Sequence, residues 1–348
     1  MPFSAQRSAQ SSGGLKISGW DTVSLKVSGN NLASGIAYDP VAERIVVVGG
    51  DNNNSTAWWS DGDPVNPLSW NEVSVGGHTE FLGQLLFNNG LFLIGAYNEN
   101  NGSAPRMFTS PDGITWTNRT TPTQDTSADN GGVVFGNGIH VAMGGTSGVG
   151  SGVGYIISSV NGTTGWTERL QSPAGLGFPG QVVFANGQFV AVGQDKQVNT
   201  SPDGINWTLR TLPTPTGTFK HCRSVAYLPL VDKWVISGFT GADKLFWSST
   251  DNAVTWAESA APWEDGNSTI WWALPDGRVI TDSKQGFGIS ETSFRYTRDG
   301  TTWDTTTIPQ ATNIRNTGQI LYIPKFNKLF VPAMQASPFG ALLLVSKG

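Results

Sequence analysis

The sequence lacks most of the residues that build disulfide frameworks, metal centres and membrane spans. Of its 348 residues, one is cysteine (Cys222), three are histidine and 14% are charged. A single cysteine excludes a disulfide within the chain, and no run of about 18 apolar residues is present to cross a membrane as a helix. No Asp-x-Asp-x-Asp-Gly calcium loop occurs, so neither a metal nor another cofactor is expected.

Positive charge is also scarce. The chain has 21 Lys and Arg residues against 26 Asp and Glu residues, a net charge of −5, and no cluster of basic residues. Proteins that bind nucleic acid use such a cluster to displace counterions from phosphates, so we expect no nucleic-acid partner. Residues 1–14 are rich in Ser, Gln and Ala, lack the apolar core of a secretory signal and are expected to form a flexible N-terminal arm. We therefore expect the chain to be made in a cytoplasm.

Glycine and tryptophan are abundant instead, with 44 and 14 copies. Many turn formers, many aromatic residues and few charges are typical of short strands joined by tight turns. This composition makes an internal repeat the first feature to look for.

One turn motif recurs along the chain. Residues 110–116 read Ser-Pro-Asp-Gly-Ile-Thr-Trp, residues 201–207 read Ser-Pro-Asp-Gly-Ile-Asn-Trp, and residues 297–303 read Thr-Arg-Asp-Gly-Thr-Thr-Trp. We expect the aspartate to accept hydrogen bonds from backbone N–H groups of its own turn, and the tryptophan to pack between neighbouring repeats. Weaker copies precede three further tryptophans, Trp70, Trp166 and Trp256. The turn aspartates are Asp61, Asp112, Asp203, Asp251 and Asp299.

A hairpin motif precedes each turn. Residues 86–93, 134–141 and 183–190 each place Asn-Gly between apolar stretches, which favours a tight hairpin because both residues accept φ > 0. The other repeats carry Tyr-x-Pro at 38–40, 227–229 and 322–324, or Pro-Asp-Gly at 275–277. Each repeat then reads as four strands, which is typical of a propeller blade.

The tryptophans that follow the turns recur at intervals of about 40 to 50 residues. A seventh repeat is split between the chain ends, because residues 313–334 and 340–346 supply three strands and residues 19–27 supply the fourth. We therefore predict an all-β fold over residues 15–348, a seven-bladed β-propeller of four-stranded antiparallel blades whose last blade is closed by the N-terminal strand. A six-bladed ring would leave residues 313–348 without a partner. The blade tryptophans are Trp20, Trp70, Trp116, Trp166, Trp207, Trp256 and Trp303.

These turns resemble the Asp-box, or BNR, repeats of sialidases, sortilin-type receptors, xyloglucan hydrolases and photosystem II assembly factors. The shorter Ser-Pro-Asp-Gly-x-x-Trp form is similar to repeats in phage structural proteins and bacterial propellers. The resemblance implies an architecture and says little about activity. Catalytic sialidases carry an Arg-Ile-Pro motif and three arginines around the central axis. This sequence has no Arg-Ile-Pro, and Arg119, Arg169 and Arg210 follow their tryptophans on predicted outer strands.

Ligand-binding residues are expected on the loops opposite the Asp-box turns. Those loops carry acids, asparagines and aromatic residues, which suit the hydroxyl edges and apolar faces of sugars but are also common turn formers. No spacing singles out a catalytic pair among their carboxylates. The candidate ligand-binding residues are Asn53, Tyr97, Glu99, Asp195, Asp243, Trp263 and Phe287.

The sequence favours a non-enzymatic module of a virus particle: a phage tail, fibre or capsid-decoration protein. Its expected partners are other virion proteins and host surface glycans, and its expected location is the virion. A glycan-active hydrolase or lyase with an axial carboxylate site is the first alternative, and an assembly-factor scaffold is the second. His140 occupies an apolar position of its hairpin and is expected to be a core residue, while the adjacent His221 and Cys222 would face opposite sides of a strand.

Overall fold

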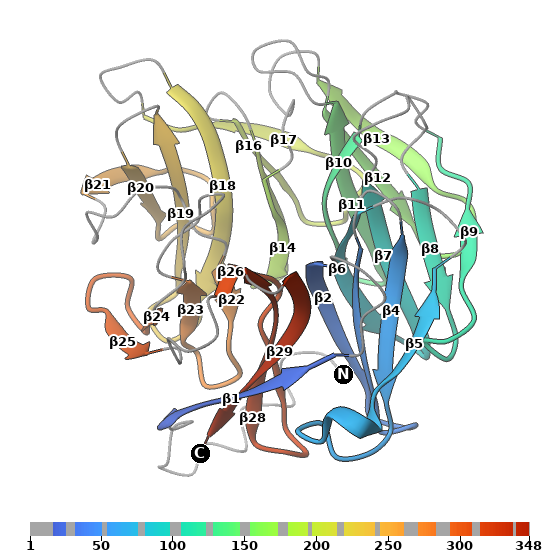
Figure 1. Ribbon diagram of the computed structural model, residues 1–348. Helices are drawn as coiled ribbons and strands as arrows, with labels where there is room; N and C mark the ends of the chain where they lie inside the picture. Colours follow the sequence, from blue (N-terminus) through green and yellow to red (C-terminus); the bar gives the residue numbers. More distant parts are fainter. Residues whose placement is uncertain are drawn as a thin grey trace.

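The computed structural model describes most of the chain as a ring of seven antiparallel sheets (Figure 1). The prediction of a seven-bladed β-propeller is therefore confirmed. The N-terminal arm expected over residues 1–14 lies outside the described residues. These are 17–25, 32–50, 54–75, 81–97, 106–122, 128–146, 154–172, 180–193, 197–213, 219–240, 244–260, 271–282, 293–307, 314–336 and 339–347.

The first four blades follow one another along the chain, and their strands are given from the central axis outward. Blade 1 consists of β2 (Leu32–Asp39), β3 (Arg44–Gly50), β4 (Ser55–Ser60) and β5 (Asn71–Ser74). Blade 2 consists of β6 (Phe81–Asn88), β7 (Leu91–Tyr97), β8 (Arg106–Ser110) and β9 (Thr117–Arg119). Blade 3 consists of β10 (Ala128–Gly136), β11 (Ile139–Thr146), β12 (Gly154–Ser159) and β13 (Thr167–Ser172). Blade 4 consists of β14 (Val182–Ala185), β15 (Gln188–Val192), β16 (Gln197–Ser201) and β17 (Thr208–Thr211).

The remaining blades complete the ring. Blade 5 consists of β18 (Phe219–Leu228), β19 (Lys233–Thr240), β20 (Lys244–Ser249) and β21 (Ala257–Ala260). Blade 6 consists of β22 (Trp271–Ala273), β23 (Val279–Asp282), β24 (Ser293–Thr297) and β25 (Asp304–Thr307). Blade 7 consists of β26 (Ile314–Thr317), β27 (Leu321–Ile323), β28 (Lys328–Ala336), β29 (Phe339–Lys347) and β1 (Gly19–Ser24).

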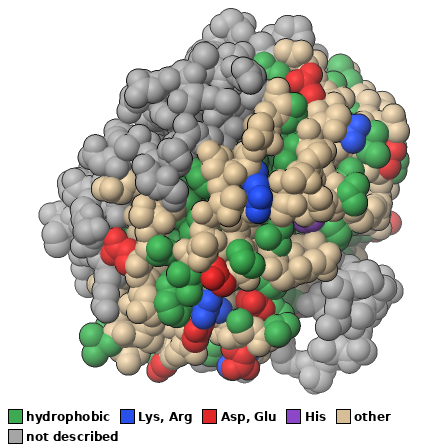
Figure 2. All heavy atoms as spheres, turned by 90° about the vertical axis from the view of Figure 1, so that its right-hand side faces the viewer, with side chains coloured by type: hydrophobic (Ala, Val, Ile, Leu, Met, Phe, Trp, Pro, Cys, Tyr) green, Lys and Arg blue, Asp and Glu red, His purple; other side chains and the backbone are tan. Residues whose placement is uncertain are grey.

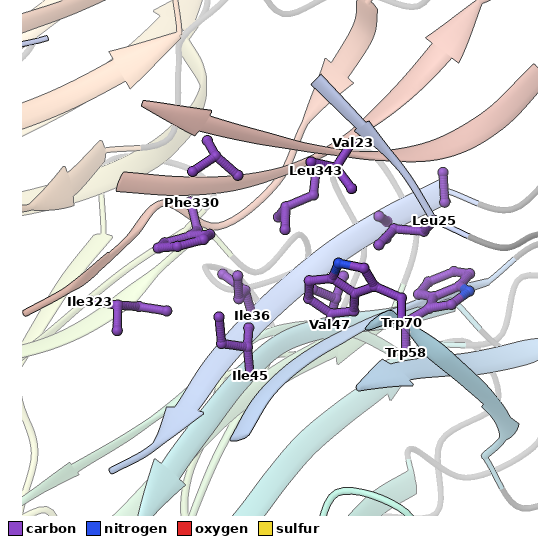
Figure 3. Packing of buried hydrophobic residues seen from close by; sticks show 13 residues of the cluster. Val23, Leu25, Ile36, Ile45, Val47, Trp58, Trp70, Ile323, Phe330 and Leu343 are labelled. Carbon is purple, nitrogen blue, oxygen red and sulfur yellow. The ribbon is translucent and has the colours of Figure 1, made fainter. Parts of the chain in front are cut away.

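The two ends of the chain close the ring, as predicted. β1 pairs antiparallel with β29, in a register that places Trp20 opposite Ser346, and the two strands lie side by side in Figure 1. Figure 3 shows the apolar cluster that joins this last blade to the first: Val23 and Leu343 point toward Trp58 and Trp70 of blade 1. The N-terminal strand therefore contributes both a ladder and buried apolar area to the closure.

The two faces of the ring differ in their connections. At one end of the strands lie the hairpins that join the first strand of a blade to the second and the turns that join the third strand to the fourth, and we call this end the turn face. At the other end, the loop face, lie the loops that join the second strand to the third and one blade to the next. The Asn-Gly hairpins are on the turn face, and Asn89, Asn137 and Asn186 have φ between 46° and 50°, a conformation that asparagine tolerates better than most residues.

Two blades depart from the common pattern. In blade 7 the first strand is interrupted at Gly318–Gln319, because the Gln319 N–H donates to Ser34 O of blade 1 (2.7 Å) instead of continuing its own ladder. In blade 1 the third-to-fourth turn is longer and contains a short 3-10 helix, η2 (Pro67–Ser69). Asn66 caps this helix by accepting a hydrogen bond from Leu68 N (3.0 Å).

Candidate functional site

Most of the predicted ligand-binding residues lie outside the described part of the structure. Only Tyr97 falls on a described element, at the end of β7 on the loop face, and its side chain is not described. The residues outside the described ranges are Asn53, Glu99, Asp195, Asp243, Trp263 and Phe287. The polar groups that the structure does describe lie on the turn face, near the central axis and on the outer rim.

The Asp-box turns use their aspartates to hold the local backbone. In blade 4, Asp203 Oδ1 accepts hydrogen bonds from Ile205 N and Asn206 N, both at 2.8 Å. Ser201 Oγ accepts from Gly204 N (2.8 Å) and so closes the other side of the turn. Blades 2 and 6 repeat this pattern with Asp112 and Asp299, and Asn161 takes the same place in blade 3.

These hydrogen bonds keep the turn carboxylates ionised. The N–H groups of Asn206 and Ile205 hold the pKa of Asp203 well below its usual range. The hydroxyl and N–H of Thr255 lower the pKa of Asp251 to about 2. A carboxylate that is ionised and saturated by its own turn is a poor general acid, because it has no proton to donate near neutral pH.

Blade 1 uses its turn aspartate differently. Asp61 forms a two-pronged ion pair with Arg44, with Nε–Oδ1 and Nη2–Oδ2 distances of 2.6 Å, and the turn backbone is capped by Asp63 through Val65 N (3.1 Å). The arginine also lies over the Trp59 ring, 4.6 Å from its centroid. Asp61 is therefore part of an interaction between the second strand and the turn.

Each blade tryptophan packs against the preceding blade. Trp116 of blade 2 joins an apolar cluster with Val46 and Val48 of blade 1. Trp166 of blade 3 packs with Leu93 and Met107 of blade 2. The same relation to the preceding blade holds for Trp20, Trp70, Trp207, Trp256 and Trp303. These tryptophans thus bury aromatic area at the seams of the ring, where a large side chain contributes most to stability.

Polar side chains on the turn face connect four of the hairpins to the next blade. The donor comes from the first hairpin of one blade, and the acceptor is a carbonyl oxygen in the third-to-fourth turn of the following blade. The described bonds are Arg44 to Asp112 O (2.6 Å), Asn137 to Pro202 O (2.6 Å), Gln188 to Asn252 O (3.0 Å) and Lys233 to Asp299 O (3.0 Å). The Asp-box turn therefore presents a carbonyl to its neighbour, in addition to ordering itself.

Two glutamines next to the innermost strands each join three blades near the axis. Gln181 of blade 4 accepts from Val225 N of blade 5 (3.1 Å) and donates to Trp271 O of blade 6 (3.1 Å). Ser224 supports the same network, because its hydroxyl donates to Gln181 and accepts from Trp271 N. We call these side chains axial clamps.

A second axial clamp joins blades 7, 1 and 2. Gln319 accepts from Ile36 N and Leu85 N, and its amide donates to Leu85 O, all at 3.1 Å. The backbones approach so closely here that a Cβ on Gly318 would lie 2.1 Å from Ser34 O, which only glycine avoids. Side-chain amides therefore occupy this part of the ring interior.

The three recurring arginines lie on the outer rim. Arg119, Arg169 and Arg210 belong to β9, β13 and β17, the outermost strands of blades 2, 3 and 4. In these positions they cannot converge on one carboxylate at the axis, which is the arrangement that a catalytic sialidase needs.

Two other titratable candidates, His140 and Cys222, are buried. His140 is 4% exposed, lies 4.7 Å from the Phe135 ring centroid, and has a pKa lowered by burial. Cys222 is buried, and burial raises the pKa of its thiol, so this group is a poor nucleophile near neutral pH. Within the described ranges, no group of three His, Cys, Asp or Glu side chains could hold a metal ion. No helix in those ranges is long and apolar enough to span a membrane.

Comparisons with known proteins show the fold alone. No family model and no curated protein matches the sequence. Among solved structures, the WD40 propeller domain of Doa1 is similar with a TM-score of 0.60 and 12% identity, covering 95% of this chain and 98% of that one. The extracellular domain of the putative one-component system BT4673 from B. thetaiotaomicron has a TM-score of 0.60 and 10% identity.

A Trypanosoma rangeli sialidase is also similar, with a TM-score of 0.53, 13% identity and 93% of this chain covered. The chain spans 57% of that sialidase and 40% of the BT4673 chain. The molecule is thus a seven-bladed β-propeller whose neighbours include WD40 and sialidase propellers.

Proposed function

We propose that this propeller is a non-enzymatic docking module of a virus particle, a phage tail, fibre or capsid-decoration protein that attaches to other virion proteins or to host surface glycans. The observation that supports this proposal is the internal use of the polar groups on the turn face and at the axis. The turn carboxylates are bound by N–H groups of their own turns or, in Asp61, by Arg44, and the hairpin donors and axial glutamines are bound to neighbouring blades. Such a ring is a rigid platform on which the loop face is left to make contacts.

A glycan array combined with product analysis tests this proposal. We expect the wild-type protein to bind glycans without cleaving them, and a variant with Tyr97→Ala, Trp263→Ala and Phe287→Ala to lose that binding. A matched control carries Val41→Ala and Leu68→Ala, because these two apolar side chains are 91% and 80% exposed on the turn face. Cleavage of a polysaccharide that disappears in Glu99→Gln or Asp243→Asn would instead establish the hydrolase or lyase alternative.

Association with particles is the second arm of the test. Mass spectrometry of purified virions should find the chain at a fixed ratio to known structural proteins. Its absence from every such preparation, together with no glycan binding, would refute the proposal.

A further inference from the structure

Three arginines occupy the same position on three neighbouring blades. Arg119, Arg169 and Arg210 each stand three residues after their blade tryptophan, on the outermost strand. The corresponding positions of the other blades hold Val23, Val73, Ser259 and Thr306. The basic residues are therefore confined to one sector of the circumference, and we call them the arginine rim.

Each rim arginine is held in place by a buried hydroxyl on the third strand of its blade. The Nε–H donates to the oxygen, so the plane of the guanidinium group is fixed relative to the sheet. The bonds are Arg119 to Thr109 (2.7 Å), Arg169 to Ser158 (2.8 Å) and Arg210 to Thr200 (3.1 Å).

The strand register shows that this arrangement is a repeated feature. In blade 3 the anchoring Ser158 pairs across the sheet with Thr167, which stands two positions before Arg169. In blades 2 and 4 the anchoring threonine likewise pairs with the residue two positions before the arginine. The bond is kept in blade 3 even though β13 bulges at Arg169. Three arginines with one anchoring scheme are therefore presented from successive blades.

No carboxylate within the described ranges forms an ion pair with a rim arginine. Arg44 and Arg278 show the opposite case, because each forms a short ion pair with an aspartate, Asp61 at 2.6 Å and Asp276 at 2.7 Å. On the side of the molecule that Figure 2 shows, blue side chains lie next to red ones near the lower edge, and another blue side chain lies among tan and green atoms near the centre. A hydroxyl partner orients a guanidinium group without cancelling its charge.

We propose that the arginine rim binds an anionic polysaccharide, one that carries carboxylate or sulfate groups at intervals along its chain. With Nε engaged, the two Nη groups of each arginine remain as a planar pair that matches two oxygens of a carboxylate or sulfate. A row of such groups around the circumference suits a polymer better than a small anion. This inference rests on the docking role proposed above and goes beyond it, because it adds the rim as a second contact surface, for an anionic glycan, to the contact proposed for the loop face.

Binding to immobilised heparin and polygalacturonate tests the proposal and separates sulfate from carboxylate recognition, with neutral dextran as the blank. The rim variant carries Arg119→Gln, Arg169→Gln and Arg210→Gln. The control variant carries Arg298→Gln, Lys325→Gln and Lys347→Gln, which removes the same charge from the turn face and from exposed ion pairs of little energetic weight. Thermal melting verifies that both variants are folded.

We expect at least one anionic polymer to retain the wild-type protein, and the rim variant to bind it roughly tenfold more weakly, because each exposed charge contact contributes a few-fold to affinity. The control variant and the loop variant with Trp263→Ala should stay within about twofold of wild type. Loss in the loop variant alone would leave the docking proposal standing and overturn the rim assignment. Equal loss in the control variant, or no retention of the wild type, would also overturn it.

A second variant keeps the test decisive if the glutamine substitutions lower stability. Thr117, Thr167 and Thr208 are exposed and stand beside the rim arginines, so Thr→Glu at these positions adds negative charge and leaves the arginine–hydroxyl bonds intact. The same tenfold loss is expected. Wild-type affinity in this variant would contradict the proposal.

Discussion

Replacing Gln181 by methionine should destabilise the whole ring, because its amide joins three blades. Methionine has nearly the same length and fills the same space, but it neither accepts from Val225 N nor donates to Trp271 O. The glutamine side chain is 5% exposed, so water does not readily replace these partners. Leaving a buried backbone group unpaired costs about 1–3 kcal/mol.

Two unpaired backbone groups place the expected loss of stability at about 2–6 kcal/mol, a large part of the 5–15 kcal/mol that stabilises a typical domain. Because the entropy of unfolding grows with chain length, this loss corresponds to a fall in the midpoint of thermal unfolding of roughly 3–8 °C for a chain of this size.

Denaturant unfolding followed by tryptophan fluorescence measures this loss, and Gln188→Met provides the control. Gln188 makes a single side-chain bond to Asn252 O on the turn face, where water can take its place. Its replacement should cost less than about 1 kcal/mol. If the two variants unfold at the same denaturant concentration, the axial clamp does not have the role assigned to it.

Three further predictions test individual parts of the ring. Gly113→Ala should lower the stability of the protein more than Gly90→Ala. Both glycines have positive φ, but only at Gly113 would a Cβ meet a neighbouring blade, at 2.4 Å. Calorimetry of the two variants measures the difference. Burial lowers the pKa of His140, so below about pH 6.5, the usual pKa of histidine, the unfolded chain binds more protons than the folded one and stability should fall as the pH drops. His140→Phe should flatten this dependence of stability between about pH 7 and 5. Asp203→Asn should be nearly neutral, since Asn161 makes the same turn bonds in blade 3, whereas Asp203→Ala should cost about 1–2 kcal/mol in a urea titration; equal effects would refute the assigned role of the turn oxygen.

The local elements of the fold could be predicted from the sequence because each has its own short-range pattern. Asn-Gly flanked by apolar residues specifies a hairpin, and Ser-Pro-Asp-Gly-x-x-Trp specifies a turn that orders itself. The split seventh blade followed from counting these units. The pairing of Gly19 with Lys347 confirms that step.

Contacts between blades could not be predicted in this way. Gln181 and Gln319 have no distinguishing neighbours in the sequence, and their partners lie between 43 and 283 residues away. The hairpin donors Asn137 and Lys233 bind carbonyl oxygens, which every residue has, so no pattern of side chains marks them. The alignment of Arg119 with its equivalents in the next two blades was visible in the sequence, but the hydroxyl that anchors it could be identified only from the strand register.

Ring closure by the N-terminal strand is the central claim, and truncation from the N-terminus measures it most directly. Chains beginning at residue 17 and at residue 26 differ by β1, which pairs with β29 and buries Trp20 and Val23. Each of these side chains contributes about 2–3 kcal/mol on burial, so the shorter chain should unfold at least 4 kcal/mol more easily or fail to fold, while the longer one matches the full-length protein. Equal stability of the two truncated chains would contradict a ring closed by this strand.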